Sequence, residues 1–163
     1  MTSKPTVRVE RSYEGPVDDL WWLWTTQEGF ESWWGPEGFR VEVRKLELHV
    51  GGALVYDMIA SDPQTIAFMK QNNMATSHGT HGKFAEIVPM KRLRITHMID
   101  FIPGMEPYEN QMVVEFVQDG GKVKMIVNID EHTTPEWTQR ATQGFESQLT
   151  KVEAALAARR KRG

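Results

Sequence analysis

Cysteine is absent from the 163-residue sequence. Its absence excludes disulfide bonds, cysteine-ligated zinc, iron–sulfur clusters and thiol nucleophiles, and it is typical of cytoplasmic proteins. Long apolar runs are also missing, since none approaches the roughly 20 residues that a membrane-spanning helix needs. Residues 1–7 contain no signal-peptide h-region. We therefore expect a cytoplasmic protein that uses oxygen, imidazole or lysine groups, or a pocket alone.

A large excess of charge of one sign is lacking as well. The sequence has 19 Lys and Arg against 22 Asp and Glu, for a formal net charge of −3, so the basic surplus of a generic nucleic-acid binder is missing. The sequence also lacks a Gly-x-Ser-x-Gly nucleophile elbow, a dinucleotide fingerprint and a complete phosphate-binding loop. We expect no nucleic-acid partner, no membrane partner, no cofactor and no metal site.

Apolar residues make up 40% of the sequence, which is typical of a folded protein. At this length, we expect a single domain over residues 1–163. Tryptophan is unusually frequent, with six residues, five of which lie between Trp21 and Trp34. Such a cluster fits a stacking platform, a membrane-interface belt or a core, and helical spacing places Trp21 and Trp24 on a buried face.

The hydrophobic pattern predicts an antiparallel sheet flanked by helices at both ends of the chain. Alternating segments predict strands over residues 7–13, 39–50, 53–60, 82–88, 92–101, 108–117 and 122–130. A slip in the alternation between Val43 and Leu46 predicts a β-bulge. Periodic segments predict two short helices, over residues 17–24 and 27–34, and a long one over residues 135–160.

The long C-terminal helix carries an apolar stripe along its whole length, and Thr133 with Glu136 fits a capping box at its start. Such a stripe needs a concave surface of similar length. The predicted fold class is therefore α+β, with a curved sheet of six or seven antiparallel strands that wraps around the long helix. Residues 62–77 form an insertion in which Asp62 and Pro63 open a short helix, and this insertion is either a lid or an interface element.

Several short motifs, in order along the chain, resemble the START-like (SRPBCC, helix-grip) superfamily. Within it, the sequence is most similar to the heat-shock protein 90 ATPase activator homologue family. The resembling segments are Leu20-Trp21, Trp33 through Phe39, Val50-Gly51-Gly52, Gly82 through Pro89 with Arg92-Leu93, and Gly144-Phe145 followed by Leu149. The resemblance implies a bacterial-type, single-domain member, with a stress-related co-chaperone or protein-interaction role among its expected functions.

Strand parity selects the residues that face the inside of the curved sheet. A mostly apolar cavity with a few polar groups is the usual make-up of a small-molecule site. The main hypothesis is therefore that a small hydrophobic or amphipathic molecule binds between the sheet and the long helix. Its predicted binding residues are Trp34, Phe39, Tyr56, Met58, His97, Tyr108, Asn110, Met112, Trp137 and Phe145.

Alternatives remain open for this set. His97 is either a hydrogen-bonded core histidine or the general acid/base of a cyclase- or hydrolase-like enzyme, in which Tyr108 or Asn110 orients a carbonyl. His78 and His81 have a metal-like spacing, but on a strand they project to opposite faces. His132 is expected at a solvated junction. A homodimer through exposed aromatic residues or residues 62–77 is a further possibility.

Overall fold

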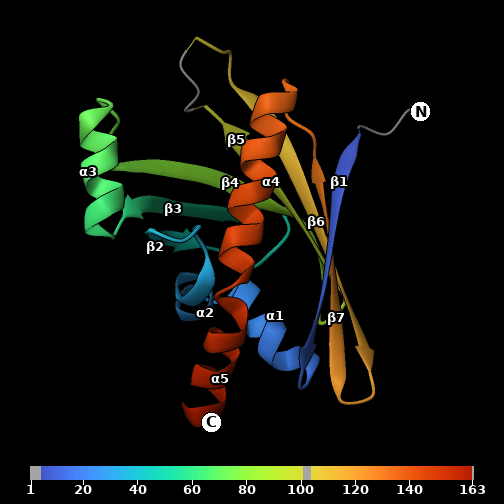
Figure 1. The fold of residues 1–163 in the computed structure, drawn as a ribbon. Helices are drawn as coiled ribbons and strands as arrows, with labels where there is room; N and C mark the ends of the chain where they lie inside the picture. The colour runs from blue at the N-terminus through green and yellow to red at the C-terminus, as the bar shows by residue number, and fades with distance from the viewer. Residues whose placement is uncertain (1–4, 101–103, 163) are drawn as a thin grey trace.

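The computed structural model describes residues 5–100 and 104–162. One antiparallel sheet of seven strands runs through it in the order β1-β7-β6-β5-β4-β3-β2 (Figure 1). The strands are β1 (Thr6–Glu14), β2 (Phe39–Leu46), β3 (Ala53–Ala60), β4 (Ser77–Val88), β5 (Arg92–Ile99), β6 (Tyr108–Asp119) and β7 (Lys122–Asp130). The helices are α1 (Val17–Thr25), α2 (Gln27–Trp33), α3 (Pro63–Gln71), α4 (Pro135–Leu149) and α5 (Val152–Arg162).

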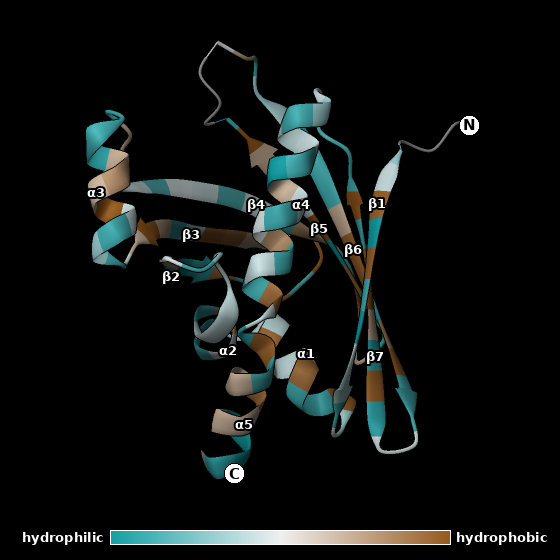
Figure 2. Ribbon diagram, in the orientation of Figure 1, coloured by the Kyte–Doolittle hydropathy of each residue, from teal (hydrophilic) through white to brown (hydrophobic). Residues whose placement is uncertain are grey.

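The curled sheet holds α4 and α5 across one of its faces, while α1 and α2 cover the end nearest α5 (Figure 1). Hydrophobic and hydrophilic residues alternate along the strands (Figure 2), so that each strand has one face for the core. The predicted α+β helix-grip fold is confirmed. Among the described residues, no helix is both long enough and apolar enough to cross a bilayer.

The limits of several strands differ from the prediction. β2 ends at Leu46, because Leu48 and Val50 lie exposed in the connection to β3. The predicted bulge is confirmed, since the register shifts between Val43 and Lys45. β4 begins at Ser77, five residues earlier than the predicted start at Gly82, and β5 ends at Ile99. Phe101, the predicted end of that strand, lies outside the described residues.

The predicted long helix is two helices, separated at Thr150 and Lys151. The backbone N–H groups of these two residues bond three residues back, to Ser147 and Gln148, as in a tighter 3₁₀ turn. The apolar stripe continues across the break, since Leu149 and Val152 are both buried. The predicted cap at Thr133 is wrong by one residue.

Thr134 is the N-cap of α4, and its hydroxyl accepts a hydrogen bond from the backbone N–H of Trp137 at 3.2 Å. Pro135 then occupies the first helical position, where its missing N–H costs nothing. Because Pro135 occupies the first helical position, the residue directly before it, Thr134 rather than Thr133, is the N-cap.

Lys151, at the break between α4 and α5, forms hydrogen bonds to the loop between α2 and β2. Its Nζ donates to the carbonyl oxygens of Gly35 at 2.6 Å, Phe39 at 3.0 Å and Pro36 at 3.3 Å. Gly35 has a φ of 96°, a left-handed conformation that glycine adopts without strain. The ammonium therefore stabilises a turn that a less flexible residue at position 35 would strain.

We expect Lys151→Met to lower the free energy of unfolding by about 2 kcal/mol, because it removes a charged donor from three carbonyl groups. Urea denaturation measures this change. The matched control is Lys45→Met, since Lys45 is exposed on β2, and we expect it to change stability by less than about 0.5 kcal/mol. Equal effects of the two substitutions would show that the Lys151 contacts contribute nothing.

The tryptophan cluster forms the core where α1 and α2 meet the sheet. Trp24 and Trp33 are fully buried, with ring centroids 5.0 Å apart. The Trp33 indole donates to the carbonyl oxygen of Leu23 at 2.9 Å. Trp22 is only partly buried, and the guanidinium of Arg159 lies 4.4 Å from its ring. Trp24 and Trp33 are therefore core residues, and the burial of Trp24 agrees with its helical spacing.

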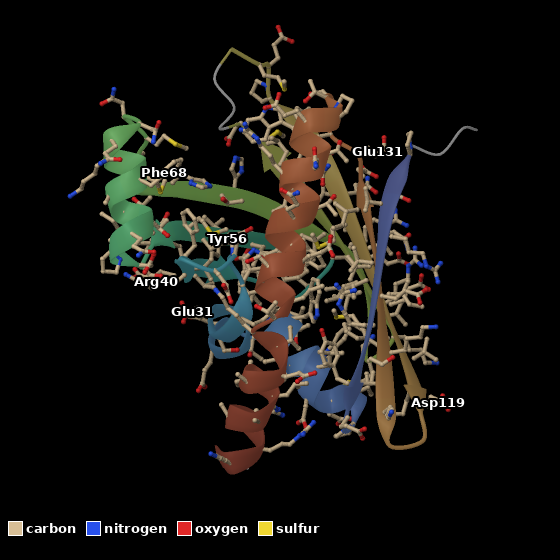
Figure 3. The ribbon with its side chains drawn as sticks, viewed as in Figure 1. Glu31, Arg40, Tyr56, Phe68, Asp119 and Glu131 are labelled. Carbon is tan, nitrogen blue, oxygen red and sulfur yellow. The ribbon has the colours of Figure 1, made fainter. Side chains whose placement is uncertain are left out.

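Helix α3 lies at the left of the sheet, beside the ends of β3 and β4 (Figure 1). Asp62 is its N-cap and accepts from the backbone N–H of Thr65 at 3.0 Å. Met69 is buried, whereas Phe68, which is labelled on α3 in Figure 3, is 61% exposed. The short helix predicted after Asp62 is therefore present.

Candidate functional site

A cavity of about 210 Å³ lies between the inner face of the sheet and helix α4. β3, β4, β5, β6 and β7 supply one wall, and α4 with the turn after α2 supplies the other. Its apolar lining consists of Trp34, Pro36, Met58, Ile99, Met112, Ile129, Ala141, Gly144 and Phe145. Its polar lining consists of Tyr56, His78, Thr80, His97, Asn110, His132 and Gln148. Tyr56 is labelled in Figure 3, on the part of the sheet beside α4.

Seven of the ten predicted binding residues line this cavity. They are Trp34, Tyr56, Met58, His97, Asn110, Met112 and Phe145. Strand parity brings five of them together, because inward residues of neighbouring antiparallel strands lie side by side. Tyr56, for example, pairs in register with Thr80, and His97 pairs with Asn110.

Three predicted residues do not line the cavity: Phe39, Tyr108 and Trp137. Phe39 and Tyr108 are the first residues of β2 and β6, and Trp137 lies in the first turn of α4. The Tyr108 hydroxyl bonds to Nδ1 of His132, and the guanidinium of Arg140 lies 5.3 Å from the Trp137 ring. Strand parity predicts which face of the sheet a residue lies on, but it does not predict how far along a strand the cavity extends. These three residues lie at the starts of their elements, outside the cavity.

Four polar residues of the cavity wall were not predicted from the sequence. His78 and Thr80 were missed because β4 begins earlier than predicted, which gives these residues an inward face. His132 is half-buried rather than solvated, and it lines the cavity. Gln148 lies on the face of α4 that packs against the sheet, and it is buried. Its position beside the apolar stripe of the helix was the one sign in the sequence that it faces inward.

His81 lies on the opposite face of β4 from His78, as expected for a strand. Its Nε2 is 2.9 Å from a carboxylate oxygen of Asp100, on the outer surface. One metal ion therefore cannot take both histidines. Within residues 5–100 and 104–162, no three His, Cys, Asp or Glu side chains gather in a way that would hold a metal.

A hydrogen-bonded chain of three aromatic side chains forms one wall. The Trp34 indole N–H lies 3.0 Å from the Tyr56 hydroxyl, which lies 3.2 Å from Nε2 of His97. An indole nitrogen can only donate, so Tyr56 accepts from Trp34 and is free to donate its own proton to His97. This assigns the neutral tautomer of His97 in which Nδ1 carries the proton.

The three cavity histidines are neutral at pH 7. Burial, with a smaller contribution from His81, lowers the pKa of His97 to about 4. Burial also lowers the pKa values of His78 and His132, although the negative charge of nearby aspartates partly offsets this effect. No Asp, Glu, Lys or Arg belongs to the described lining. The site is therefore an uncharged space with polar groups held in place.

Gln148 is the polar residue that α4 contributes, and it is 4% exposed. Its Oε1 accepts from the backbone N–H of Gly35 at 3.0 Å. This contact fixes the orientation of the amide group. Among the described residues, its Nε2 finds no hydrogen-bond partner, although it is buried.

The burial of His97 makes stability depend on pH. The unfolded chain binds this proton near the ordinary pKa of 6.5, whereas the folded protein binds it only near pH 4. Acidification from pH 7 to pH 5 therefore favours the unfolded state, by about 2 kcal/mol from His97 alone. The lowered pKa values of His78 and His132 act in the same direction.

We expect urea denaturation to show this loss in the wild-type protein and a smaller loss in His97→Gln, which cannot titrate at that position. The window above pH 5 avoids most carboxylate titration. An identical decline in both proteins would contradict a neutral, buried His97.

A family sequence profile, described as "Activator of Hsp90 ATPase homolog 1-like protein", matches residues 14–157. Among curated proteins, no sequence matches significantly. Solved structures with the same fold include a protein of Nitrosomonas europaea, with 19% identity, a TM-score of 0.74 and coverage of 99% of both chains. A protein of Arthrobacter aurescens has 18% identity and a TM-score of 0.75, over 94% of this chain and 86% of its own.

A third structure is the AHSA1 protein of Silicibacter pomeroyi. It has 19% identity and a TM-score of 0.74, over 95% of this chain and 99% of its own. At these identities, the three structures establish the shared fold alone.

Proposed function

This chain belongs to the Activator of Hsp90 ATPase homolog 1-like family, and within that family we propose that it binds a small, uncharged, largely apolar molecule in the cavity between the sheet and α4. The resemblance noted in the sequence is thereby confirmed at the level of the family. The observation that carries the proposal is the cavity itself, which has apolar walls, buried polar groups and no charged lining residue.

The volume of the cavity, about 210 Å³, suits a compact molecule. An apolar cavity of about 150 Å³ binds benzene, so about 210 Å³ suits a ring compound somewhat larger than benzene. Typical pockets for drug-sized ligands begin near 300 Å³. A bicyclic aromatic compound is therefore a suitable probe.

The absence of charge in the lining favours a neutral ligand. A carboxylate moved from water into this space would meet neutral histidines and no counter-ion, and burying an unpaired charge is costly. Neutral compounds are therefore expected to bind better than acids of the same shape.

Catalysis does not form part of the proposal. At pH 7, His97 carries no second proton to give as a general acid, since its pKa is about 4. Its Nε2 is also occupied by the Tyr56 hydroxyl. The co-chaperone role rests on family membership alone, and no contact among the described residues favours it. The cytoplasmic location, the single domain and the homodimer stay predictions.

The test is a titration with indane, 1-indanone, indole and indane-1-carboxylate, followed by tryptophan emission and by the indole N–H resonance of Trp34. We expect saturable binding of at least one neutral compound, roughly tenfold or more tighter than the carboxylate. Binding of none of the neutral compounds, or a preference for the carboxylate, would contradict the proposed function.

A further inference from the structure

We infer that the ligand of this cavity accepts a hydrogen bond from Nδ1–H of His97 through a carbonyl oxygen. The inference rests on the proposed function and adds the chemical group that the cavity recognises. Its starting point is the protonation of one ring, on a histidine that lies on the inner face of β5 and is 7% exposed.

The position of the proton on His97 follows from its aromatic neighbours. The Trp34 indole nitrogen lies 3.0 Å from the Tyr56 hydroxyl and can only donate to it. Among the described residues, Nε2 of His97 is the acceptor that the Tyr56 hydroxyl reaches, at 3.2 Å. If Nε2 carried the proton, the buried hydroxyl would face two donors and its own proton would have no acceptor, which is costly. Nδ1 therefore carries the proton of the neutral ring.

Nδ1 of His97 also keeps accessible surface. Within the described part of the chain, the side-chain atoms that lack both a partner and accessible surface are the Tyr13 hydroxyl, Arg94 Nε and Gln148 Nε2. Nδ1 of His97 is not among them, although the ring forms its hydrogen bond through Nε2. The accessible surface of His97 faces the cavity, because the residue lines it and β4 and β6 flank it within the sheet.

The neighbours of His97 in the sheet do not take this proton. Gly82, its partner on β4, has no side chain. Asn110, its partner on β6, uses its side-chain Nδ2 to donate to the backbone carbonyl of Asp130 at 2.9 Å. The acceptor for Nδ1–H therefore comes from a molecule within the cavity.

A carbonyl oxygen is the acceptor that matches this donor and its surroundings. It is neutral, as suits a cavity with no charged residue in its described lining. A ketone, ester or amide oxygen also accepts without bringing a hydroxyl proton that would need a further partner. An apolar ligand without the oxygen leaves the N–H of His97 unpaired in the filled cavity, so the site discriminates against it.

The first test needs no variant. It reads the two ring nitrogens of His97 by ¹⁵N NMR in the wild-type protein at pH 7, through their couplings to the carbon-bound ring protons. We expect a protonated Nδ1 and an unprotonated Nε2. Saturating 1-indanone should shift the Nδ1 resonance more than indane does, since indane has the same ring skeleton and no carbonyl. An unprotonated Nδ1, or equal shifts from the two compounds, overturns the inference.

The second test compares affinities for the same two compounds, measured by NMR titration of the Trp34 indole N–H. His97→Leu removes the donor and keeps an apolar side chain. The matched control is His49→Leu, because His49 is exposed in the connection between β2 and β3. We expect the wild type and the control to bind 1-indanone roughly tenfold more tightly than indane. In His97→Leu, the two affinities should agree within about twofold. Urea denaturation checks that each variant folds.

The outcomes separate this inference from the proposed function. Equal affinities in the wild type, or a tenfold preference that persists in His97→Leu, would show that His97 does not recognise the carbonyl, and the proposed function would stand. If 1-indanone, indane and indole all fail to bind the wild type, the proposed function itself fails.

Discussion

Replacing Gly144 by leucine is expected to weaken 1-indanone binding by roughly 50-fold or more without destabilising the protein. Gly144 lines the cavity from α4, and a Cβ atom added there meets no other atom within 4 Å. A helical side chain leans toward the helix N-terminus, so the leucine covers Ala141, another lining residue. The leucine takes up space in the cavity equal to about three methylene groups of the ligand. Losing the burial of those groups costs about 2.4 kcal/mol of binding free energy, or roughly 50-fold in affinity.

Stability is expected to stay the same or to rise in this variant. Glycine within a helix costs about 1 kcal/mol relative to alanine, and the open space over Gly144 accepts the new side chain. Gly144→Ala should therefore raise the free energy of unfolding by about 0.5–1 kcal/mol. Gln143→Leu, which places the same leucine on the exposed face of α4, is the control for binding. Wild-type affinity in Gly144→Leu would mean that the ligand lies elsewhere.

Trp24→Ala is expected to cause the largest loss of stability, about 3–5 kcal/mol. Trp24 is 0% exposed, and its ring lies 5.0 Å from that of Trp33 and 5.5 Å from that of Trp34. Its indole N–H also points to the sulfur of Met125 at 3.4 Å. The substitution leaves a cavity at the junction of α1, α2 and the sheet. A domain at the lower end of the typical range of net stability, about 5 kcal/mol, would lose most of it.

Trp22→Ala is the matched control, because Trp22 is the neighbouring tryptophan that lies only partly buried beside Arg159. We expect a loss of about 1 kcal/mol from its cation–π contact and its smaller buried area. Chemical denaturation monitored by circular dichroism measures both variants. Similar losses for Trp22 and Trp24 would contradict the assignment of Trp24 to the centre of the core.

The elements and the inward faces of the sheet were predictable because both depend on local periodicity. His97 and Asn110, for example, alternate with outward residues on strands whose pattern is regular, and they meet across the β5–β6 pair. The bulge after Val43 was predictable for the same reason, since one extra residue reverses the pattern. A second bulge, between Phe84 and Glu86, leaves no comparable signal because the pattern around it is mixed.

The details of the site were less predictable because they depend on contacts between distant segments. The start of β4 at Ser77 is set by pairing with Ile59 on β3, rather than by the glycine-rich sequence of its first residues. The orientation of Gln148 depends on Gly35, more than a hundred residues away. The break at Lys151 depends on the carbonyl groups of the same turn. Such long-range hydrogen bonds leave no periodic pattern.

The most direct measurement of where a ligand lies uses the nine methionines as NMR probes. Met58 and Met112 line the cavity, whereas Met74 and Met90 are exposed elsewhere. With methyl-labelled methionine and saturating 1-indanone, we expect large shifts and intermolecular NOEs at the Met58 and Met112 methyl groups, and unchanged Met74 and Met90 signals. NOEs to Met74 or Met90 with none to Met58 and Met112 would contradict binding between the sheet and α4.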